Sequence, residues 1–259
     1  MRITIVGSGS IIPTKKRFSS SILLETEDRK LLLDIGPGTL EKLGKKGVDV
    51  NEVERVLITH FHVDHVGDLP AMIKLRAYSR SGLKSEKPEK LHIYGPKGLV
   101  DFLDDLLYRN RFLSYLRVLG CMRYLVIHEV WEGLVEDSRN LRIYSIPVEH
   151  FEGVAYRVEA DDVSLVYSGD TVPDERLIEF AQGVDVLIHE CSFPHNLLLG
   201  KHTSDMQLAE IARRVRPRIL VAVHLYPPME GREEKLKEML EEAVDGRVIV
   251  AEDLEVIEV

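Results

Sequence analysis

The stretch THFHVDH, residues 59–65, is the most informative part of this chain, because it places three histidines and one aspartate directly after the apolar run ERVLIT. Imidazole nitrogens and carboxylate oxygens are common zinc ligands. On an extended backbone, period-two spacing puts His60 and His62 on one side. Asp64 and His65 then lie past a bend, where they can face a second ion. A solvated, histidine-rich turn is the alternative, but this spacing after a buried-type strand favours a metal site.

Four side chains cannot complete two coordination shells, so further ligands have to come from other parts of the chain. Candidates stand where three apolar runs end: His150 after LRIYSIPVE, Asp170 after SLVYSG and His224 after RILVAV. Each alone has an ordinary interpretation, as a hydrogen-bonded core histidine or as an aspartate that caps the next helix. Three at matching positions, in a chain that needs ligands, favour metal binding.

Short apolar or alternating segments, separated by glycine, proline and charged turns, predict strands along most of the chain. The expected strands are residues 2–6, 20–25, 30–34, 54–59, 91–94, 141–147, 153–159, 163–168, 184–189, 218–223, 247–250 and 254–258. Helices are expected from Asp68, over 98–119, from Pro173 to before Gly183, from Ser204 and over 231–243. Residues 79–90 (SRSGLKSEKPEK) predict an exposed loop. This order predicts two face-to-face sheets with helices outside, and we expect one domain over 1–259.

The motif HxHxDH, followed by a distant histidine, a distant aspartate and a last histidine, resembles the metallo-β-lactamase superfamily over most of the chain. The resemblance implies an α+β fold: a four-layer αββα sandwich of two mixed sheets with helices outside, and the site at one edge of the sheets. The metal ligands that it implies are His60, His62 and His150 for one ion, Asp64, His65 and His224 for the other, and Asp170 as the bridge. Asp34, in LLLDIGPGT, is similar to the family's early aspartate, which supports the metal loop.

Three further segments are similar to the ribonuclease Z branch: GSGSIIPTKKRFSSSILLE near the N-terminus, HIYGPKGL, and VYSGDTVPDERLIEFAQGVDVLIHECSF. Residues 188–192 (IHECS) resemble its His-Glu-Ala-Thr segment, and residues 201–204 (KHTS) resemble its later His-Ser-Thr segment. The glutamate and the later histidine work together in that branch, which implies catalytic roles for Glu190 and His202. The alternative for His202 is a histidine at a helix N-terminus beside the Ser204 cap, but histidine is the commonest general acid.

The chain also departs from that branch. Ribonuclease Z carries a long inserted arm, which it uses to grip transfer RNA, between the third metal histidine and the bridging aspartate. Here only two predicted strands lie between His150 and Asp170, with no Gly- and Lys-rich arm. Val63 follows His62 where the family usually has glycine. The substrate therefore does not carry over from the branch, and we expect a small or single-stranded phosphodiester.

These residues predict a dinuclear metal-dependent hydrolase, first of all a phosphodiesterase. In the expected mechanism a metal-bridging hydroxide attacks phosphorus, and His202, oriented by Glu190, protonates the leaving oxygen. Asp64 belongs to the same catalytic group. Alternatives on this site are hydrolysis of a sulfate ester, lactone or thioester, and transfer-RNA 3′-end processing. A non-hydrolytic di-iron redox protein is a further class, but redox members of the superfamily carry glutamate where this chain has His62.

Composition narrows the partners and the location. The formal net charge of −9 and the sequence pI of about 5.6 disfavour generic nucleic-acid binding, although bound cations would reverse the charge locally. Two cysteines without a CxxC pair exclude a disulfide framework, and the first residues predict a strand instead of a signal peptide. We expect a cytoplasmic protein without a membrane partner, and zinc as its metal, with manganese or iron as alternatives. Its expected partners are a small phosphodiester or nucleotide-like substrate, or RNA, and the second subunit of the homodimer that the resemblance implies.

Three further features have ordinary interpretations. Gly7-Ser8-Gly9 follows a predicted strand, as in a dinucleotide-binding loop, but no third glycine or helix start follows, so we predict a turn. Cys191 beside Glu190 predicts a buried small residue. The four arginines within residues 213–218 are typical of a solvated helix end.

Overall fold

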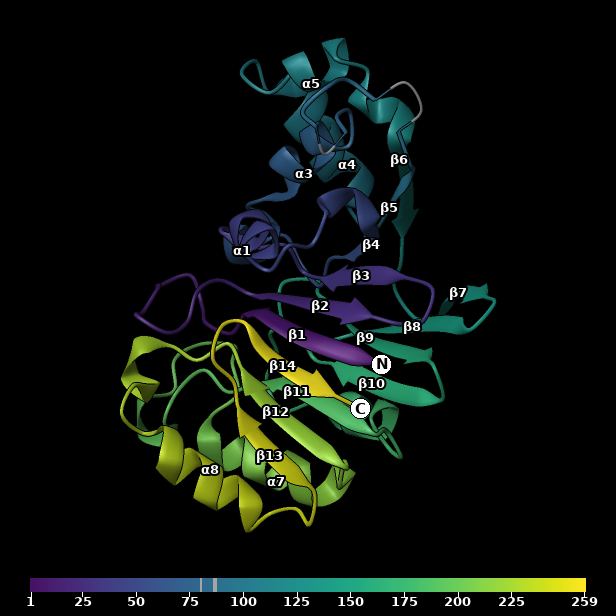
Figure 1. The fold of residues 1–259 in the computed structure, drawn as a ribbon. Helices are drawn as coiled ribbons and strands as arrows, with labels where there is room; N and C mark the ends of the chain where they lie inside the picture. The colour runs from purple at the N-terminus through teal and green to yellow at the C-terminus, as the bar shows by residue number, and fades with distance from the viewer. Residues whose placement is uncertain (80, 86–87) are drawn as a thin grey trace.

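The computed structural model describes residues 1–79, 81–85 and 88–259, and two sheets of seven strands each form the centre of this part of the chain. The expected exposed loop over 79–90 falls partly on residues 80 and 86–87, which lie outside the described residues. The first sheet has the order β14-β1-β2-β3-β4-β5-β6 and the second has the order β13-β12-β11-β10-β9-β8-β7 (Figure 1). Each sheet is mixed, with an antiparallel half and a parallel half.

The strand bounds follow the apolar segments of the sequence closely. The first sheet contains β1 (Arg2–Gly7), β2 (Ser21–Glu25), β3 (Lys30–Leu33), β4 (Val53–Leu57), β5 (Leu91–Gly95), β6 (Leu125–Glu129) and β14 (Glu255–Glu258). The second contains β7 (Gly133–Ser138), β8 (Leu141–Pro147), β9 (Val154–Ala160), β10 (Val163–Tyr167), β11 (Val186–Glu190), β12 (Ile219–Val223) and β13 (Arg247–Val250).

Helices lie outside both sheets. The α-helices are α1 (Thr39–Lys45), α2 (Val63–Val66), α3 (Leu69–Leu75), α4 (Leu99–Asp104), α5 (Tyr115–Val118), α6 (Glu175–Phe180), α7 (Asp205–Val215) and α8 (Glu233–Glu241). Shorter turns are η1 (Val50–Glu52), the π-helical η2 (Asp105–Arg109), η3 (Cys121–Tyr124), η4 (His195–Leu197) and η5 (Pro227–Met229). Within the described ranges, every helix is too short or too polar to cross a membrane.

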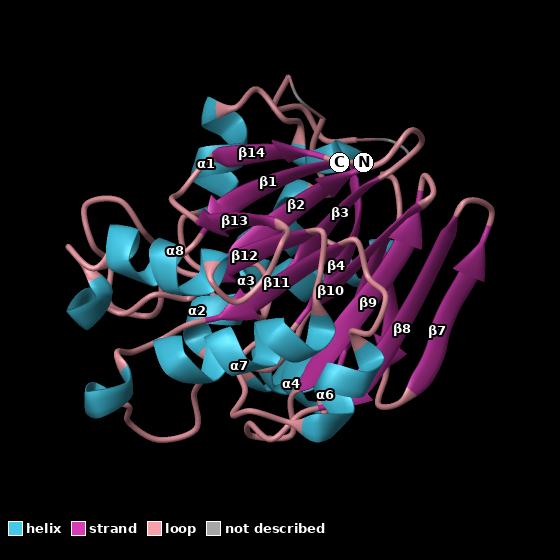
Figure 2. Cartoon of the chain, turned by 90° about the horizontal axis from the view of Figure 1, so that it is seen from below, coloured by secondary structure: helices cyan, strands magenta, loops and turns pink. Residues whose placement is uncertain are grey.

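Alternation along the strands creates three apolar layers. In β9, Tyr156 and Val158 pack between the two sheets, while Ala155 points to the outer face of its sheet. That outer face is covered by α6, α7 and α8 (Figure 2). The outer face of the first sheet packs against α1, α3 and α4. Helix, sheet, sheet and helix layers confirm the predicted αββα sandwich.

Two parts of the secondary structure differ from the prediction. The sequence pattern did not indicate β6 and β7, which are half-buried or exposed strands at the edges of the two sheets and therefore lack a fully apolar run. The helix expected over 98–119 is broken into α4, η2 and α5. At the break, the side-chain oxygen of Asn110 accepts hydrogen bonds from the backbone N–H groups of Phe112 and Leu113, which competes with helical bonding.

Candidate metal centre and active site

The predicted ligands come together because the strands before them end at the same edge. Strands β10, β11 and β12 are parallel neighbours, so the segments that follow them emerge side by side. Asp170 follows β10, Glu190 ends β11 and His224 follows β12. His150 follows β8, and the histidine-rich segment follows β4 of the facing sheet. The site thus lies between the two sheets, at the edge where β4, β8, β10, β11 and β12 end.

The first group of side chains consists of His60, His62, His150 and Asp170, whose candidate ligand atoms lie within 4.8 Å of one another. Oδ2 of Asp170 lies 3.7 Å from Nε2 of both His60 and His150. Nε2 of His150 lies 3.5 Å from Nδ1 of His62. Three nitrogens and one oxygen therefore face a common point, as the period-two spacing predicts.

The second group consists of Asp64, His65 and His224. Nε2 of His224 lies 3.4 Å from Oδ2 of Asp64 and 3.3 Å from Oδ1 of Asp170. Nε2 of His65 lies 3.4 Å from the same Asp170 oxygen. Asp170 thus presents one carboxylate oxygen to each group, which is the geometry of a bridging ligand.

These donor sets fit two divalent ions. Ligand atoms at zinc distances around a tetrahedral ion are separated by about 3.4 Å, close to the separations observed here. Three of the atoms, Nε2 of His60, Nε2 of His65 and Oδ1 of Asp170, are buried and lack a hydrogen-bond partner among the described residues. Buried polar atoms are rarely left in that state unless an ion or water satisfies them. The histidine and aspartate clusters therefore indicate divalent metal binding.

The charge states of His60 and Asp170 suit ligation. Burial, together with the neighbouring His65, holds the pKa of His60 well below its ordinary value, so this ring is neutral and offers a lone pair. Burial alone would raise the pKa of Asp170, but His224, His65 and His60 around it hold that pKa well below the usual range. The aspartate is accordingly ionised.

Asp34 supports the histidine-rich segment from beneath, as its resemblance to the early family aspartate implies. Its carboxylate accepts hydrogen bonds from the backbone N–H of Thr59 at 2.8 Å and from the hydroxyl of Tyr167 at 2.9 Å. It also lies 2.7 Å from Nδ1 of His65. Because Nδ1 donates there, Nε2 of His65 keeps its lone pair for the cluster. Asp34 itself has a left-handed backbone with φ of 59°.

Three other histidines have their Nδ1 atoms engaged in the same way. Nδ1 of His60 lies 3.1 Å from the hydroxyl of Thr59. Nδ1 of His150 lies 2.9 Å from the carbonyl oxygen of Lys201, and Nδ1 of His224 lies 3.1 Å from Oγ of Ser192. A donor role for each Nδ1 leaves each Nε2 free to bind a metal ion. Sequence reasoning gave no role to Thr59, Lys201 or Ser192. A signal was available only for Ser192, because the His-Glu-Ala-Thr resemblance aligns it with a residue that carries a hydroxyl.

Glu190 and His202 meet beside the clusters. Nδ1 of His202 lies 3.1 Å from Oε1 of Glu190 and 3.9 Å from Oδ2 of Asp170. Glu190 is fully buried and also accepts hydrogen bonds from the hydroxyl of Ser192 at 2.6 Å and from two backbone N–H groups, those of Thr171 and Thr203. Burial alone would lower the pKa of His202, but the hydrogen bond to Glu190 and the nearby carboxylates raise it above the ordinary value.

A pocket of about 620 Å³ opens in front of these side chains. Its polar wall includes His62, Asp64, His150, Asp170 and His202. Its other wall is mainly apolar and consists of Ile11, Val63, Phe151, Phe193, Leu199, Gly200 and Tyr226, with Lys201 beside them. The pocket therefore offers a polar centre for a reacting group and an apolar surface for its substituent.

The glycine-containing segment Gly7-Ser8-Gly9 contacts the residue that follows His224. The backbone N–H of Leu225 donates to the carbonyl oxygen of Ser8 at 3.2 Å, and Gly9 pairs with Leu225 as a bridge. A Cβ atom at Gly7 would lie 1.8 Å from the carbonyl oxygen of Ser19, so the close approach of Gly7 to Ser19 requires glycine. The predicted turn is wrong: Gly7 is the last residue of β1, and Gly9 continues the pairing as an isolated bridge, because its N–H donates to the carbonyl oxygen of Phe18 at 2.7 Å. Cys191 is buried, as predicted.

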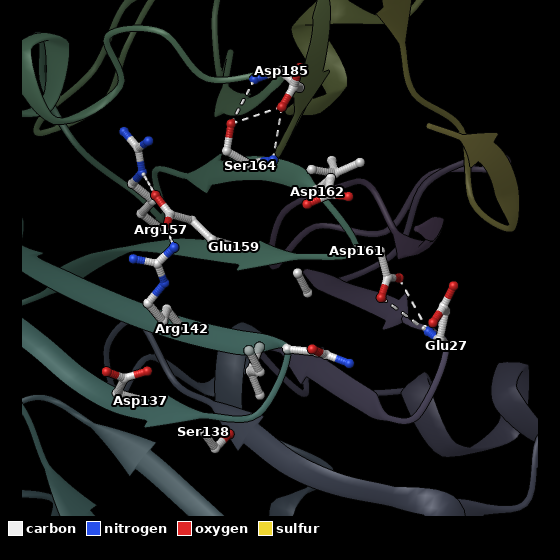
Figure 3. A pocket seen from close by; sticks show the side chains of 14 residues that line it. Glu27, Asp137, Ser138, Arg142, Arg157, Glu159, Asp161, Asp162, Ser164 and Asp185 are labelled. Carbon is white, nitrogen blue, oxygen red and sulfur yellow. Dashed lines mark hydrogen bonds and ion pairs between the residues drawn. The ribbon is translucent and has the colours of Figure 1, made fainter.

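A second hollow, of about 720 Å³, lies at the other end of the second sheet (Figure 3). Several of its polar side chains are paired with one another: Nε of Arg157 donates to Glu159 at 2.9 Å, and the hydroxyl of Ser164 donates to Asp185 at 2.9 Å. It lies where β10 begins, away from the strand ends that carry the ligands. This hollow takes no part in the candidate metal centre.

Known proteins are similar in sequence to this chain over all or most of its length. A family model described as "Anti-Pycsar protein Apyc1" matches residues 1–241. A protein named Ribonuclease Z from Mycobacterium marinum is 28% identical over 278 residues, which cover 100% of this chain and 99% of that protein. Ribonuclease Z from Mycobacterium avium is 29% identical over 278 residues, with 100% and 98% covered.

Solved structures share the fold at lower sequence identity. The metallo-beta-lactamase fold protein YhfI from Bacillus subtilis matches with a TM-score of 0.81 at 21% identity, covering 99% of each chain. The short form of human tRNase Z matches with a TM-score of 0.75 at 21% identity, covering 100% of this chain and 99% of that one. A diphosphatase from the PhnP family matches with a TM-score of 0.72 at 17% identity, covering 100% and 97%. These matches confirm the fold expected from the sequence.

Proposed function

The chain belongs to the anti-Pycsar protein Apyc1 family, and from this membership we propose that it is a dinuclear metal-dependent phosphodiesterase that cleaves a small phosphodiester. At the coarser level it is a ribonuclease-Z-like hydrolase of the metallo-β-lactamase fold, with histidine and aspartate clusters that indicate metal binding. One observation carries the finer proposal: the hydrogen-bonded pair of His202 and Glu190 lies against Asp170, between the two clusters. A general acid at that place suits an ester whose leaving oxygen needs a proton.

The metal ligands are assigned as the sequence predicts. His60, His62 and His150 would hold one ion, Asp64, His65 and His224 would hold the other, and Asp170 would contact both. Zinc suits these nitrogen and oxygen donors best, and manganese or iron would also be accepted. When bound, the two ions supply Lewis acidity and lower the pKa of a water molecule toward neutrality.

His202 is assigned to protonate the leaving group. Its Nδ1 is held by Glu190, so its Nε2 is the atom available to the pocket, which His202 lines. Glu190 keeps the ring oriented and raises the pKa of His202 above its ordinary value, which favours the protonated ring that a general acid requires. Since Glu190 accepts four hydrogen bonds, it is a rigid anchor and not itself the donor.

Asp64 is assigned to hold the attacking water. One of its oxygens, Oδ2, faces His224 at 3.4 Å, and the residue also lines the pocket. Burial would raise the pKa of Asp64, but the neighbouring imidazole rings of His224 and His65 lower it. The carboxylate is therefore ionised and can accept a hydrogen bond from a water molecule in the pocket.

An RNA endonuclease is the second candidate, favoured by the full-length likeness to proteins named Ribonuclease Z. The hairpin between His150 and Asp170 argues for the smaller substrate. Strands β9 and β10 are joined by the two-residue turn Asp161-Asp162, and no arm extends from it.

Metal analysis combined with a chromogenic panel tests the proposal. The panel contains phosphodiesters, phosphomonoesters, sulfate esters and lactones, assayed with the zinc-loaded and the manganese-loaded protein. We expect the highest kcat/KM for a phosphodiester, with about two metal ions per chain. Turnover confined to a lactone or a sulfate ester would replace the phosphodiesterase assignment while leaving the metal assignment in place.

A further inference from the structure

Phe151 occupies a position that the stability of the fold does not explain. It follows His150 and has a left-handed backbone with φ of 36°, and Glu152 after it has φ of 58°. A bulky side chain rarely adopts this conformation, because it brings Cβ close to the neighbouring carbonyl oxygen. The tight turn closes when the N–H of Gly153 donates to the carbonyl oxygen of His150 at 2.7 Å. Glycine or asparagine would satisfy such a turn with less strain.

The strained backbone of Phe151 is not offset by burial of its ring. Phe151 is 64% exposed, which is unusual for an apolar side chain beside a buried site. Its contacts are edge-on: the ring centroids lie 4.8 Å from His62 and 5.0 Å from His150. Strained backbone and an exposed aromatic ring at one residue, next to candidate ligands, indicate a functional role.

The surroundings of Phe151 show what kind of group it can receive. The ring lines the 620 Å³ pocket on the same apolar wall as Leu199 and Tyr226. Lys201 holds its ammonium group 5.5 Å from the ring centroid, and among the described residues it is the only lysine or arginine in the pocket lining. The polar wall is formed by the clusters that would hold a phosphate. A substituent attached to that phosphate would therefore meet apolar side chains and one cation.

We infer that Phe151 is a specificity-determining residue whose ring receives an aromatic substituent of the substrate, with Lys201 beside it. This inference rests on the proposed phosphodiesterase function and adds the class of ester: a phosphodiester that carries an aryl or heteroaryl group. An aromatic ring packs on another through offset or edge-on contacts, which the exposed phenyl ring of Phe151 offers. The neighbouring ammonium group adds attraction to the face of a ring or to a phosphate oxygen.

Binding of two phosphate esters without chromogenic groups tests the inference. Diphenyl phosphate and dimethyl phosphate are titrated into the zinc-loaded protein by calorimetry, or by phosphorus NMR where binding is weak. Wild type should bind diphenyl phosphate more tightly, and Phe151→Ala should lower that preference about tenfold, within the range of one stacking contact. Phe112→Ala is the matched control, because Phe112 is 86% exposed and lies outside the pocket lining. It should keep the wild-type preference.

A second variant separates recognition from a structural role. Phe151→Asn introduces a residue that tolerates a left-handed backbone, so the thermal unfolding midpoint of this variant should equal or exceed that of wild type. Its preference for diphenyl phosphate should nevertheless fall as in Phe151→Ala, with metal content unchanged. A lower unfolding midpoint together with lost metal would make Phe151 a structural support of His62 and His150 and overturn the inference.

The remaining outcomes distinguish this inference from the proposed function. Hydrolysis of bis(4-nitrophenyl) phosphate by wild type supports the phosphodiesterase assignment independently of Phe151. If hydrolysis occurs but the preference for diphenyl phosphate is absent, or is equal in wild type and Phe151→Ala, the inference alone is wrong. If no phosphodiester is cleaved while a Phe151-dependent preference remains, the phosphodiesterase assignment alone is wrong. Absence of both results rejects both.

Discussion

The carbonyl oxygen of Lys201 accepts a hydrogen bond from Nδ1 of His150 at 2.9 Å, so the residue beside the proposed general acid also fixes a proposed metal ligand. On the other side of His202, the N–H of Thr203 donates to Glu190 at 3.1 Å. The segment 201–203 therefore contacts both the candidate acid pair and the first cluster. Any substitution in this segment has to be judged by metal content as well as by activity, because the two are physically connected.

The first prediction concerns the bridging carboxylate. Asp170→Ala should reduce the metal content from about two ions per chain to one or none, since its two oxygens face different clusters. Mass spectrometry of the metal content after preparation without chelators is the measurement. Asp101→Ala, a change at an exposed helical aspartate, is the control and should keep both ions. Trace metal in wild type, with no activation by added zinc or manganese, would contradict the central assignment.

The second prediction concerns the leaving group. His202→Ala should hardly affect esters that release a nitrophenolate, which departs as an anion without help. For esters that release an alkoxide, kcat/KM should fall by ~10²–10⁴-fold, the range of general acid catalysis. Glu190→Gln should follow the same trend more mildly, because it orients the ring through a 3.1 Å contact. An equal loss across the whole leaving-group series, with the metal ions gone, would instead identify His202 as a ligand or a structural residue.

The third prediction concerns substrate size. A small phosphodiester should be cleaved with a higher kcat/KM than precursor transfer RNA at physiological salt. Long RNA gains most of its affinity from many phosphate contacts, and a chain of net charge −9 with a two-residue turn between β9 and β10 provides few. Assays of both substrates across a salt series are the measurement. Correctly placed cleavage of the RNA at physiological salt would show that another surface grips it, with the arginines of 213–218 the first to test.

Sequence reasoning could identify the candidate ligands for two physical reasons. His60, His62 and Asp64 lie within one short segment, where spacing alone brings them together. His150 and Asp170 are distant in sequence, but each stands where an apolar strand ends. The strands before them, β8 and β10, both pair antiparallel with β9 and therefore run in the same direction, which brings their carboxyl ends to one edge.

The supporting contacts could not be predicted in the same way. Whether the hydroxyl of Ser192 reaches a histidine ring depends on how the loops after β11 and β12 pack, which no local pattern encodes. The left-handed backbone of Phe151 contradicts its local preference and is imposed by the turn around it. Edge strands β6 and β7 are exposed on one side and lack the apolar signal of the central strands. Such features arise from tertiary structure and overrule local propensity.

The fourth prediction concerns stability against pH. Glu136 on β7 accepts hydrogen bonds from Nε and Nη2 of Arg55 on β4, at 2.9 and 2.7 Å, and thereby joins the two sheets. Burial would raise the pKa of Glu136, but Arg55, Tyr94 and Ser138 lower it from 4.5 to about 2. Because the folded-state pKa is lowered, the stabilisation is complete above pH 4.5 and is lost as the pH falls toward 2.

Glu136→Gln should therefore lower the free energy of unfolding at neutral pH by about 2 kcal/mol, the scale of a charged hydrogen bond. The difference from wild type should shrink between pH 4.5 and about 2, the interval set by the two pKa values. Urea unfolding followed by the fluorescence of Trp131, the single tryptophan, measures it. Glu132→Gln, at an exposed neighbouring position, is the control. A difference that stays constant over this interval would show that the charge of Glu136 is not the source of the stabilisation.

The fifth prediction concerns Ser192, which connects the candidate acid pair to the second cluster. Its hydroxyl lies 2.6 Å from Oε2 of Glu190 and 3.1 Å from Nδ1 of His224. A hydroxyl has one proton, and the carboxylate is the stronger acceptor, so Ser192 donates to Glu190 and accepts from Nδ1 of His224. That arrangement places the lone pair of His224 on Nε2, which faces Asp64 and Asp170.

Ser192→Ala should weaken zinc binding by about 10–100-fold, the usual cost of losing a hydrogen bond that orients a metal-binding histidine. The loss of affinity should concern one of the two ions, because His224 is assigned to only one cluster. Competition with a chromophoric chelator would resolve the affinities of the two zinc ions. Ser192→Thr keeps the hydroxyl and should therefore bind zinc as tightly as wild type. If the role of Ser192 were purely steric, the larger threonine would not bind zinc more tightly than alanine. Equal zinc affinity in wild type and Ser192→Ala would mean that the packing of His224 against Tyr226, whose ring centroids are 5.5 Å apart, is sufficient to orient the imidazole.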